Sequence, residues 1–208
     1  MVLLFMPVSA GAVSAADEEY AAVLRLKPRI AHGAKLFELC AACHGKDGDG
    51  SADGSVPAIA GQFMPVLVKQ LIEFRYGERH SIRAEGFVAD HRPNAQDLAD
   101  AAAYVSSLEP RTPPVRNDLV QTAYGATLFE NLCASCHGSR GDGDRGAHVP
   151  RLAGQHSEYL AEQMREATHG GRPGMERDHA RLFAKLGIDD VNALARYLAE
   201  VAPARAGR

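Results

Sequence analysis

Two copies of one short motif contain all four cysteines of this 208-residue chain. Each copy reads Cys-x-x-Cys-His, at residues 40–44 and again at residues 133–137. Two cysteines at this spacing can each add a thiol to a vinyl group of haem, and the histidine that follows can bind the iron as an axial ligand. The motif therefore predicts two covalently bound haem c groups, held by Cys40, Cys43 and His44 and by Cys133, Cys136 and His137.

Other uses of paired cysteines fit the chain less well. A structural zinc site needs four ligands in one place, and paired zinc-binding motifs usually lie about 15 to 20 residues apart. Here Cys40 and Cys133 are 93 residues apart. A redox dithiol does not need the histidine that follows, and a disulfide framework is typical of shorter chains with more cysteine.

The composition limits the classes of partner. The formal net charge is −3 and no basic stripe stands out, which argues against nucleic acid and favours redox proteins with a complementary face. Aromatic residues make up 6% of the chain and tryptophan is absent. Two small domains with so few large apolar side chains would have thin cores, unless a porphyrin adds apolar volume to each.

The first 16 residues carry no charged side chain and resemble a leader segment. An apolar run at residues 2–6, then small residues, then Asp17 are typical of a secretory signal peptide. The run is shorter than the roughly 20 residues that a membrane-spanning helix needs. We therefore expect residues 1–16 to be a signal peptide cleaved near Ala15 or Ala16, a mature protein in the bacterial periplasm, and no stable membrane insertion.

The two halves of the chain are similar to each other at a fixed offset. A shift of 93 residues places Cys40 on Cys133, Pro57 on Pro150, Gln62 on Gln155, Arg79 on Arg172 and Tyr104 on Tyr197. Agreement over such a length indicates an internal duplication. A proline-rich stretch after the first copy predicts a linker. The expected domains are residues 17–108 and 119–208, joined by residues 109–118.

Each copy shows helical spacing of apolar residues in three segments. These are residues 31–40, 63–76 and 94–108 in the first copy and residues 122–133, 156–169 and 188–201 in the second. Asn94, with Asp97 three residues later, predicts a helix start. Runs of glycine and aspartate at residues 45–54 and 138–146 predict loops. They lack the further ligands of a calcium loop, so we interpret them as solvated turns.

Taken together, these features resemble the two-haem bacterial cytochrome c4 family. The resemblance rests on the duplication, the Gly-x-x-Leu-Phe segment before each haem motif, the Ala-Gly-Gln that follows a proline, and a Gly-x-Arg that precedes a methionine. It implies an all-α fold of two tandem class I cytochrome c domains, each wrapped around one covalent haem. It also implies a protein that carries electrons between respiratory complexes.

Each haem iron needs a second axial ligand, and the thioether of methionine is common in electron-transfer cytochromes c. In the second copy Met175 follows Gly-Gly-Arg-Pro-Gly, the place where the resembling family keeps its ligand. His137 and Met175 are therefore the expected pair for haem 2. Met164 lies within a predicted helix at a leucine-like position, so we interpret it as part of the core.

The first copy has no methionine at the corresponding position, where Ile82 stands instead. The candidates for haem 1 are His80, which we favour, then His91, then Met64 and His32, with an open or water-bound iron as a further alternative. If haem 1 has two histidine ligands, its potential should be lower than that of a His-Met haem, since a thioether stabilises reduced iron. Electrons would then move from haem 1 to haem 2.

Further residues are expected around the haems. In class I domains the proline after the haem motif offers its carbonyl to the ring N–H of the axial histidine, and Pro57 and Pro150 are placed for this. The remaining expected contacts are Arg79 and Arg172 with haem propionates, and Gln62 and Gln155 at the haem crevice. For these four side chains, a surface salt bridge or a hydrogen bond at a helix start stays an alternative.

The leading hypothesis is an electron carrier between respiratory or dehydrogenase partners, with one electron per haem. Such a protein is not an enzyme and needs no catalytic side chain, because the cofactors carry the chemistry. Its contacts with partners should be small and transient. A second hypothesis is the haem subunit of a multi-subunit oxidoreductase, for example a sulfur-compound or alcohol dehydrogenase. A third makes haem 1 a ligand-binding or catalytic centre.

Overall fold

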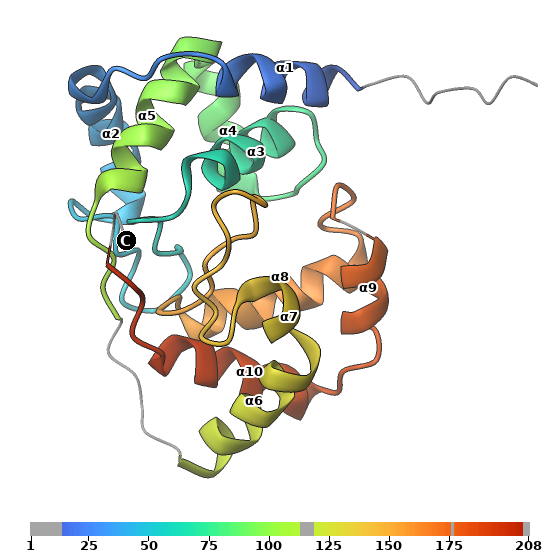
Figure 1. Ribbon diagram of the computed structural model, residues 1–208. Coiled ribbons are helices and arrows are strands. Elements are labelled where there is room, and N and C mark those ends of the chain that lie inside the picture. The colour runs from blue at the N-terminus through green and yellow to red at the C-terminus, as the bar shows by residue number, and fades with distance from the viewer. Residues whose placement is uncertain (1–13, 113–118, 176, 206–208) are drawn as a thin grey trace, which may run out of the picture.

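The structure is a computed structural model that describes residues 14–112, 119–175 and 177–205. Helices dominate it (Figure 1), and the only β-pairing within these ranges is one isolated bridge between Asp144 and Val149. The helices are α1 (Ala15–Leu24), α2 (Ile30–His44), α3 (Met64–Arg75), α4 (Ile82–His91), α5 (Ala95–Ser107), α6 (Leu119–Leu132), α7 (Ala134–His137), α8 (Ser157–His169), α9 (Arg177–Phe183) and α10 (Ile188–Glu200). None of the described helices is long and apolar enough to cross a membrane.

The helices form two halves, α1–α5 and α6–α10, which occupy the upper and lower parts of Figure 1. Each half has its own apolar core. The first core includes Phe37 and Leu98, and the second includes Phe129, Leu194 and Leu198. This arrangement confirms the predicted all-α fold with two tandem domains.

In each half the last helix crosses the helix that leads into the haem motif, and a glycine permits the crossing. Gly33 of α2 lies against the backbone of α5 at Asp100, and Gly125 of α6 lies against the backbone of α10 at Ala193. A Cβ atom at either glycine would overlap the carbonyl oxygen of the opposite helix. The close approach therefore requires the absence of a side chain at both positions.

An aromatic pair lies beside each crossing. The ring centroids of Phe37 and Tyr104 are 5.4 Å apart, and those of Phe129 and Tyr197 are 5.5 Å apart. Tilted aromatic pairs at such distances add to the stabilisation that burial gives. The near-identical geometry shows that the duplication read from the sequence is also a duplication of the packing.

The six predicted helices are confirmed as α2, α3, α5, α6, α8 and α10. The predicted start at Asn94 is also confirmed. Its side chain accepts hydrogen bonds from the backbone N–H groups of Gln96 and Asp97, and the Asp97 carboxylate accepts one from the N–H of Asn94 at 3.1 Å. This reciprocal pair is a capping box, which satisfies N–H groups that a helix start leaves without partners.

Four of the described helices were not predicted, namely α1, α4, the four-residue α7 and α9. The other three are also short. They have 10, 10 and 7 residues, so few turns are available to show a period. The side chain of Val23 in α1 is fully buried in the core of the first half. The predicted cleavage site near Ala15 or Ala16 lies in the first turn of α1, and residues 1–13 of the predicted signal peptide lie outside the described residues.

The described part of the predicted linker, residues 109–112, is not helical and is held against the first half. The ring of Pro110 lies over Gly61. A guanidinium nitrogen of Arg111 lies 2.9 Å from a carboxylate oxygen of Asp47 and 3.0 Å from one of Asp49. The rest of the predicted linker, residues 113–118, lies outside the described residues.

A buried carboxylate ties α5 to the start of α2. Asp100 is fully buried and accepts hydrogen bonds from the backbone N–H of Arg29 at 2.7 Å and from Nε2 of Gln96 at 2.7 Å. Its Oδ2 also lies 2.8 Å from Nδ1 of His32. Burial by itself raises the pKa of Asp100, but these hydrogen bonds outweigh it and hold the pKa at about 2.

The Asp100 network predicts how stability depends on pH. The folded pKa of about 2 is below the ordinary value of about 3.9, so the stabilisation is fully present above pH ~4 and is lost as pH falls towards 2. We expect Asp100→Asn to lower the free energy of unfolding by roughly 2 kcal/mol at pH 7 and by much less near pH 2. Denaturant titrations followed by circular dichroism across this range measure the difference, and a pH-independent difference contradicts the assignment.

The helix crossing predicts an effect of adding one methyl group. Gly125→Ala should destabilise the second half by roughly 1–3 kcal/mol, because α10 must move away from α6. Gly86→Ala in α4 is the matched control, since a Cβ there meets no atom within 4 Å and alanine favours a helix by about 1 kcal/mol over glycine. Urea denaturation of both variants should give opposite shifts, and equal shifts would rule out the crossing as the cause.

Candidate haem sites

The histidines of the two motifs end α2 and α7, and each is fixed by the same hydrogen bond. Nδ1 of His44 lies 2.9 Å from the carbonyl oxygen of Pro57, and Nδ1 of His137 lies 3.0 Å from that of Pro150. A carbonyl oxygen only accepts, so Nδ1 donates its proton and Nε2 keeps the lone pair that binds a metal. These are the hydrogen bonds that the sequence predicted for the two prolines.

A repeated tight turn brings each proline to its histidine. The backbone N–H of Gly50 donates to the carbonyl oxygen of His44 at 2.9 Å, and that of Gly143 donates to the carbonyl oxygen of His137 at 2.8 Å. Both glycines have positive φ, +82° and +73°, and a Cβ at either would overlap the carbonyl oxygen six residues further on. The glycine-rich runs therefore fold into turns that no other residue fits as well.

Burial keeps the two histidines in the form that binds a metal. The pKa of His44 and the pKa of His137 are both lowered, mainly because burial disfavours the charged ring. The hydrogen bond to the proline carbonyl offsets part of this shift in each case. At neutral pH both rings are therefore neutral, with Nε2 unprotonated.

The four thiols are free and lie where each motif meets its core. Cys40 and Cys133 are half-buried against the apolar clusters, whereas Cys43 and Cys136 are exposed. Burial raises the pKa of Cys40, and raises that of Cys133 to about 11. Two free thiols beside an anchored imidazole are the donor set that a covalent haem requires, so both motifs fit the group.

The distal side of the second half contains a histidine that the sequence did not point to, and the assignment of Met175 to haem 2 stays a prediction. Met175, the expected second ligand, lies in the loop before α9 and donates its backbone N–H to the carbonyl oxygen of Arg172 at 3.0 Å. The side chain beside His137 is that of His179, whose ring centroid is 6.1 Å from that of His137. Sequence reasoning missed His179, because the 93-residue offset aligns it with Gly86, which carries no side chain.

In the first half, the favoured candidates lie at the surface. His80 is exposed, with Nδ1 3.5 Å from the Glu85 carboxylate. His91 is also exposed, stacks on Phe87, and has Nδ1 2.9 Å from the carbonyl oxygen of that residue. Within residues 14–112, no ring contact joins either side chain to His44. The assignment of His80 to haem 1 stays a prediction.

The remaining candidates for haem 1 are placed as follows. His32 bonds to Asp100 in the first turn of α2, and His44 follows 12 residues later at the other end, which corresponds to about 18 Å along the helix. Met64 packs against the core of the first half. Ile82, which occupies the position of Met175, is 94% exposed. Of these candidates, His32 lies too far from His44 along the same helix to be the second axial ligand of haem 1.

The two arginines expected at the propionates lie at the seam, which is the contact surface between the half formed by α1–α5 and the half formed by α6–α10. Arg79 is buried and donates to the hydroxyl of Tyr159 and to Oε1 of Gln163, the latter at 2.7 Å. Arg172 lies 3.8 Å from Glu73, and its Nε is buried with no hydrogen-bond partner among the described residues. Two cations around one carboxylate leave a buried positive charge that an anionic propionate would balance. Both assignments stay predictions.

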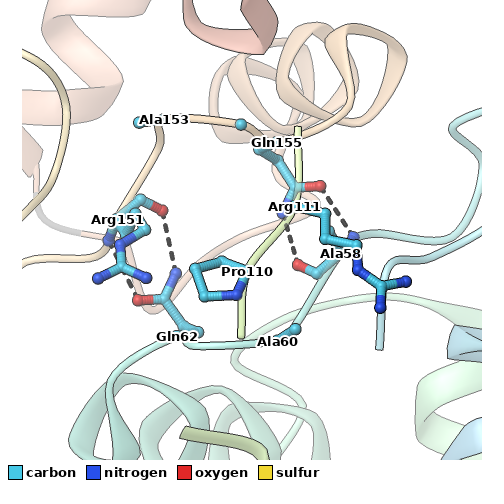
Figure 2. A pocket seen from close by; sticks show the side chains of 9 residues that line it. Ala58, Ala60, Gln62, Pro110, Arg111, Arg151, Ala153 and Gln155 are labelled. Carbon is cyan, nitrogen blue, oxygen red and sulfur yellow. Dashed lines mark hydrogen bonds between the residues drawn. The ribbon is translucent and has the colours of Figure 1, made fainter. Parts of the chain in front are cut away.

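Two glutamines join the halves through a pseudo-two-fold arrangement (Figure 2). Gln62 exchanges two hydrogen bonds with the backbone of Arg151, at 3.0 and 3.1 Å. Gln155 exchanges two with the backbone of Ala58, at 2.8 and 2.9 Å. Each Oε1 also accepts from the N–H of the next residue, at a helix start. These contacts favour the helix-start alternative, and the expectation that Gln62 and Gln155 help to close the haem crevice stays a prediction.

Proline rings complete the seam. Pro110, after the first half, lies over Gly61, and Pro203, after the second, lies over Gly154. A small cavity of about 20 Å³ opens here, lined in part by Gln62, Pro110 and Gln155. The glutamine and proline contacts of the seam are therefore repeated in both directions.

Paired Cys-x-x-Cys-His motifs with anchored imidazoles, on a duplicated all-α fold, define a two-haem c-type cytochrome. The family model described as Cytochrome c matches residues 30–109 and 122–202. The chain is 32% identical to cytochrome c4 of Azotobacter vinelandii over 77% of this chain and 83% of that protein. It is 30% identical to the thiosulfate dehydrogenase electron acceptor of Stutzerimonas stutzeri, over 90% of this chain and 94% of that protein.

A crystal structure of reduced cytochrome c4 from Pseudomonas stutzeri matches the fold with a TM-score of 0.74 and 28% identity. The match covers 84% of this chain and all of that one. The chain belongs to the cytochrome c family, within its two-haem cytochrome c4 group. It carries two covalent haem c groups and is an electron carrier.

The seam predicts that the two halves unfold together. Removing both side-chain amides with Gln62→Ala and Gln155→Ala should split the thermal unfolding of the holoprotein into two transitions, because four hydrogen bonds between the halves are lost, each contributing about 1 kcal/mol. Asn131→Ala is the control, since that amide bonds only within α6. Differential scanning calorimetry measures both. A single unchanged transition in the double variant would contradict the prediction.

Proposed function

We propose that this cytochrome works in the bacterial periplasm and accepts electrons from a dehydrogenase. The proposal combines the uncharged segment at residues 1–16 with the similarity to an electron acceptor of thiosulfate dehydrogenase. In this proposal the folded domains are residues 17–108 and 119–208, joined by residues 109–118. The donor is then a sulfur-compound dehydrogenase, and the acceptor is a further redox protein of the respiratory chain.

The duplicated histidine–proline hydrogen bond supports one part of this proposal, namely the attachment of a haem in each half. In both halves it leaves Nε2 as the metal-binding nitrogen, next to two free thiols. We assign covalent attachment of haem 1 to Cys40 and Cys43 and of haem 2 to Cys133 and Cys136. A bound haem c supplies one-electron exchange.

The protein's own residues supply position and charge in this proposal. His44 and His137 would each hold an iron through Nε2, with Pro57 and Pro150 fixing the ring orientation. The buried guanidinium of Arg172 offers an unused Nε donor to a propionate. No side chain has to gain or lose a proton for the electron to move.

A second candidate function is the binding of a small molecule at haem 1. The observation that favours it is the lack of any donor at the two positions that correspond to Met175 and His179. Ile82 and Gly86 stand there, and a Cβ at Gly86 meets no atom within 4 Å. Carbon monoxide added to the ferrous protein tests this candidate directly, because it binds only an iron with an open or easily displaced distal ligand.

The attachment and the function are tested together. The holoprotein should have the mass of two haem additions, and Cys133→Ala with Cys136→Ala should remove one of them while haem 1 remains. Stopped-flow mixing with a reduced thiosulfate dehydrogenase should then reduce both haems of the native protein. If the native protein contains both haems and is reduced by dithionite but by no dehydrogenase donor, the proposed function is wrong.

A further inference from the structure

Two histidine rings lie close together in the second half. The ring centroids of His137 and His179 are 6.1 Å apart, and the ring planes are inclined at 78°. Nδ1 of His137 is occupied by the carbonyl oxygen of Pro150. The metal-binding Nε2 therefore lies on the ring edge away from that loop.

The separation of the rings suits two imidazoles on one metal ion. A metal–imidazole nitrogen bond is about 2 Å long. Ring bonds close to the conjugated C–N length of about 1.33 Å place a ring nitrogen roughly 1.1 Å from the centroid. Two imidazoles on opposite sides of one iron thus have centroids roughly 6.2 Å apart. The observed 6.1 Å agrees with this value.

The ring of His179 is held in place by its own helix. It is the third residue of α9, and the ring of Phe183, one turn later, lies 5.8 Å from it. Phe183 in turn packs against the apolar core of the second half. His179 is therefore positioned by the fold rather than displayed on a surface loop.

The loop that contains Met175 is fixed against the first half. The backbone N–H of Gly174 donates to the carbonyl oxygen of Glu78 in the first half at 2.9 Å. A Cβ at Gly174 would lie 2.9 Å from the Cβ of Glu78, so this loop packs tightly on the seam. The contact keeps the residue before Met175 against the opposite half.

We propose that His179, and not Met175, is the second axial ligand of haem 2. The assignment rests on the attachment of haem 2 to Cys133, Cys136 and His137 proposed above. It makes haem 2 a bis-imidazole haem, which has a lower potential than a His-Met haem. The predicted flow of electrons from haem 1 to haem 2 required a His-Met haem 2, so it no longer follows.

The test replaces each candidate ligand in the full-length holoprotein. Mass spectrometry first establishes that each variant still carries two haems; a native protein with only haem 1 attached would refute the proposed attachment rather than the choice of ligand. In His179→Gly, electron paramagnetic resonance of the oxidised protein should show that one of the two haems loses its low-spin signal. Added imidazole should restore the signal, because it can occupy the space left by the side chain.

Two further variants separate His179 from Met175. His179→Met should create a thioether–iron charge-transfer band in the near-infrared, and it keeps a side chain in the site if His179→Gly folds poorly. Met175→Leu should leave the spectra of both haems unchanged. The proposal is overturned if Met175→Leu removes such a band from the native protein or produces a high-spin haem, or if neither His179 variant changes either haem.

Discussion

The hydrogen bond between the ring N–H of each motif histidine and a proline carbonyl is the contact on which the site depends. It sets the tautomer, leaves Nε2 for the iron and fixes the orientation of the ring, in both halves and at nearly the same length, 2.9 and 3.0 Å. The tight turns at Gly50 and Gly143 bring Pro57 and Pro150 within hydrogen-bond distance of the two histidines. The histidine is in turn located by the helix leading into the motif, which is pressed against the last helix of its half at Gly33 or Gly125.

The seam extends the same duplication to the contact between halves. Gln62 and Gln155 make matching hydrogen bonds in opposite directions, and Pro110 and Pro203 cover matching glycines. A pseudo-symmetric contact of this kind holds the two halves in one relative orientation. Arg79 and Arg172 at the same seam add positive charge that an anionic propionate would balance.

Much of the fold could be predicted from the sequence. The Cys-x-x-Cys-His motifs, the offset of 93 residues and the apolar periodicity gave the cofactors, the duplication and six helices, since each is a local or repeated pattern. The prolines were also found from their place after the motif. The contacts of Gln62 and Gln155 were not, because a sequence does not show which backbone lies opposite a side chain in another half.

The distal side shows the limit of reasoning from a repeat. Met175 was selected because it follows a familiar loop, yet the structure places His179 beside His137 one turn later, on a seven-residue helix too short to show a period. The first copy could not reveal this, because the residue at the corresponding position is Gly86. The two halves thus share their proximal sides and differ in their distal sides.

That difference is the central claim, and a redox titration of the holoprotein followed by its visible spectrum tests it most directly. Because His179 lies beside His137 while Ile82 and Gly86 stand at the corresponding positions of the first half, the distal surroundings of the two haems differ. The haems should therefore reduce in two separate one-electron steps, with a different reduced-minus-oxidised spectrum for each step. A single midpoint potential with one spectrum shared by both haems would contradict the account.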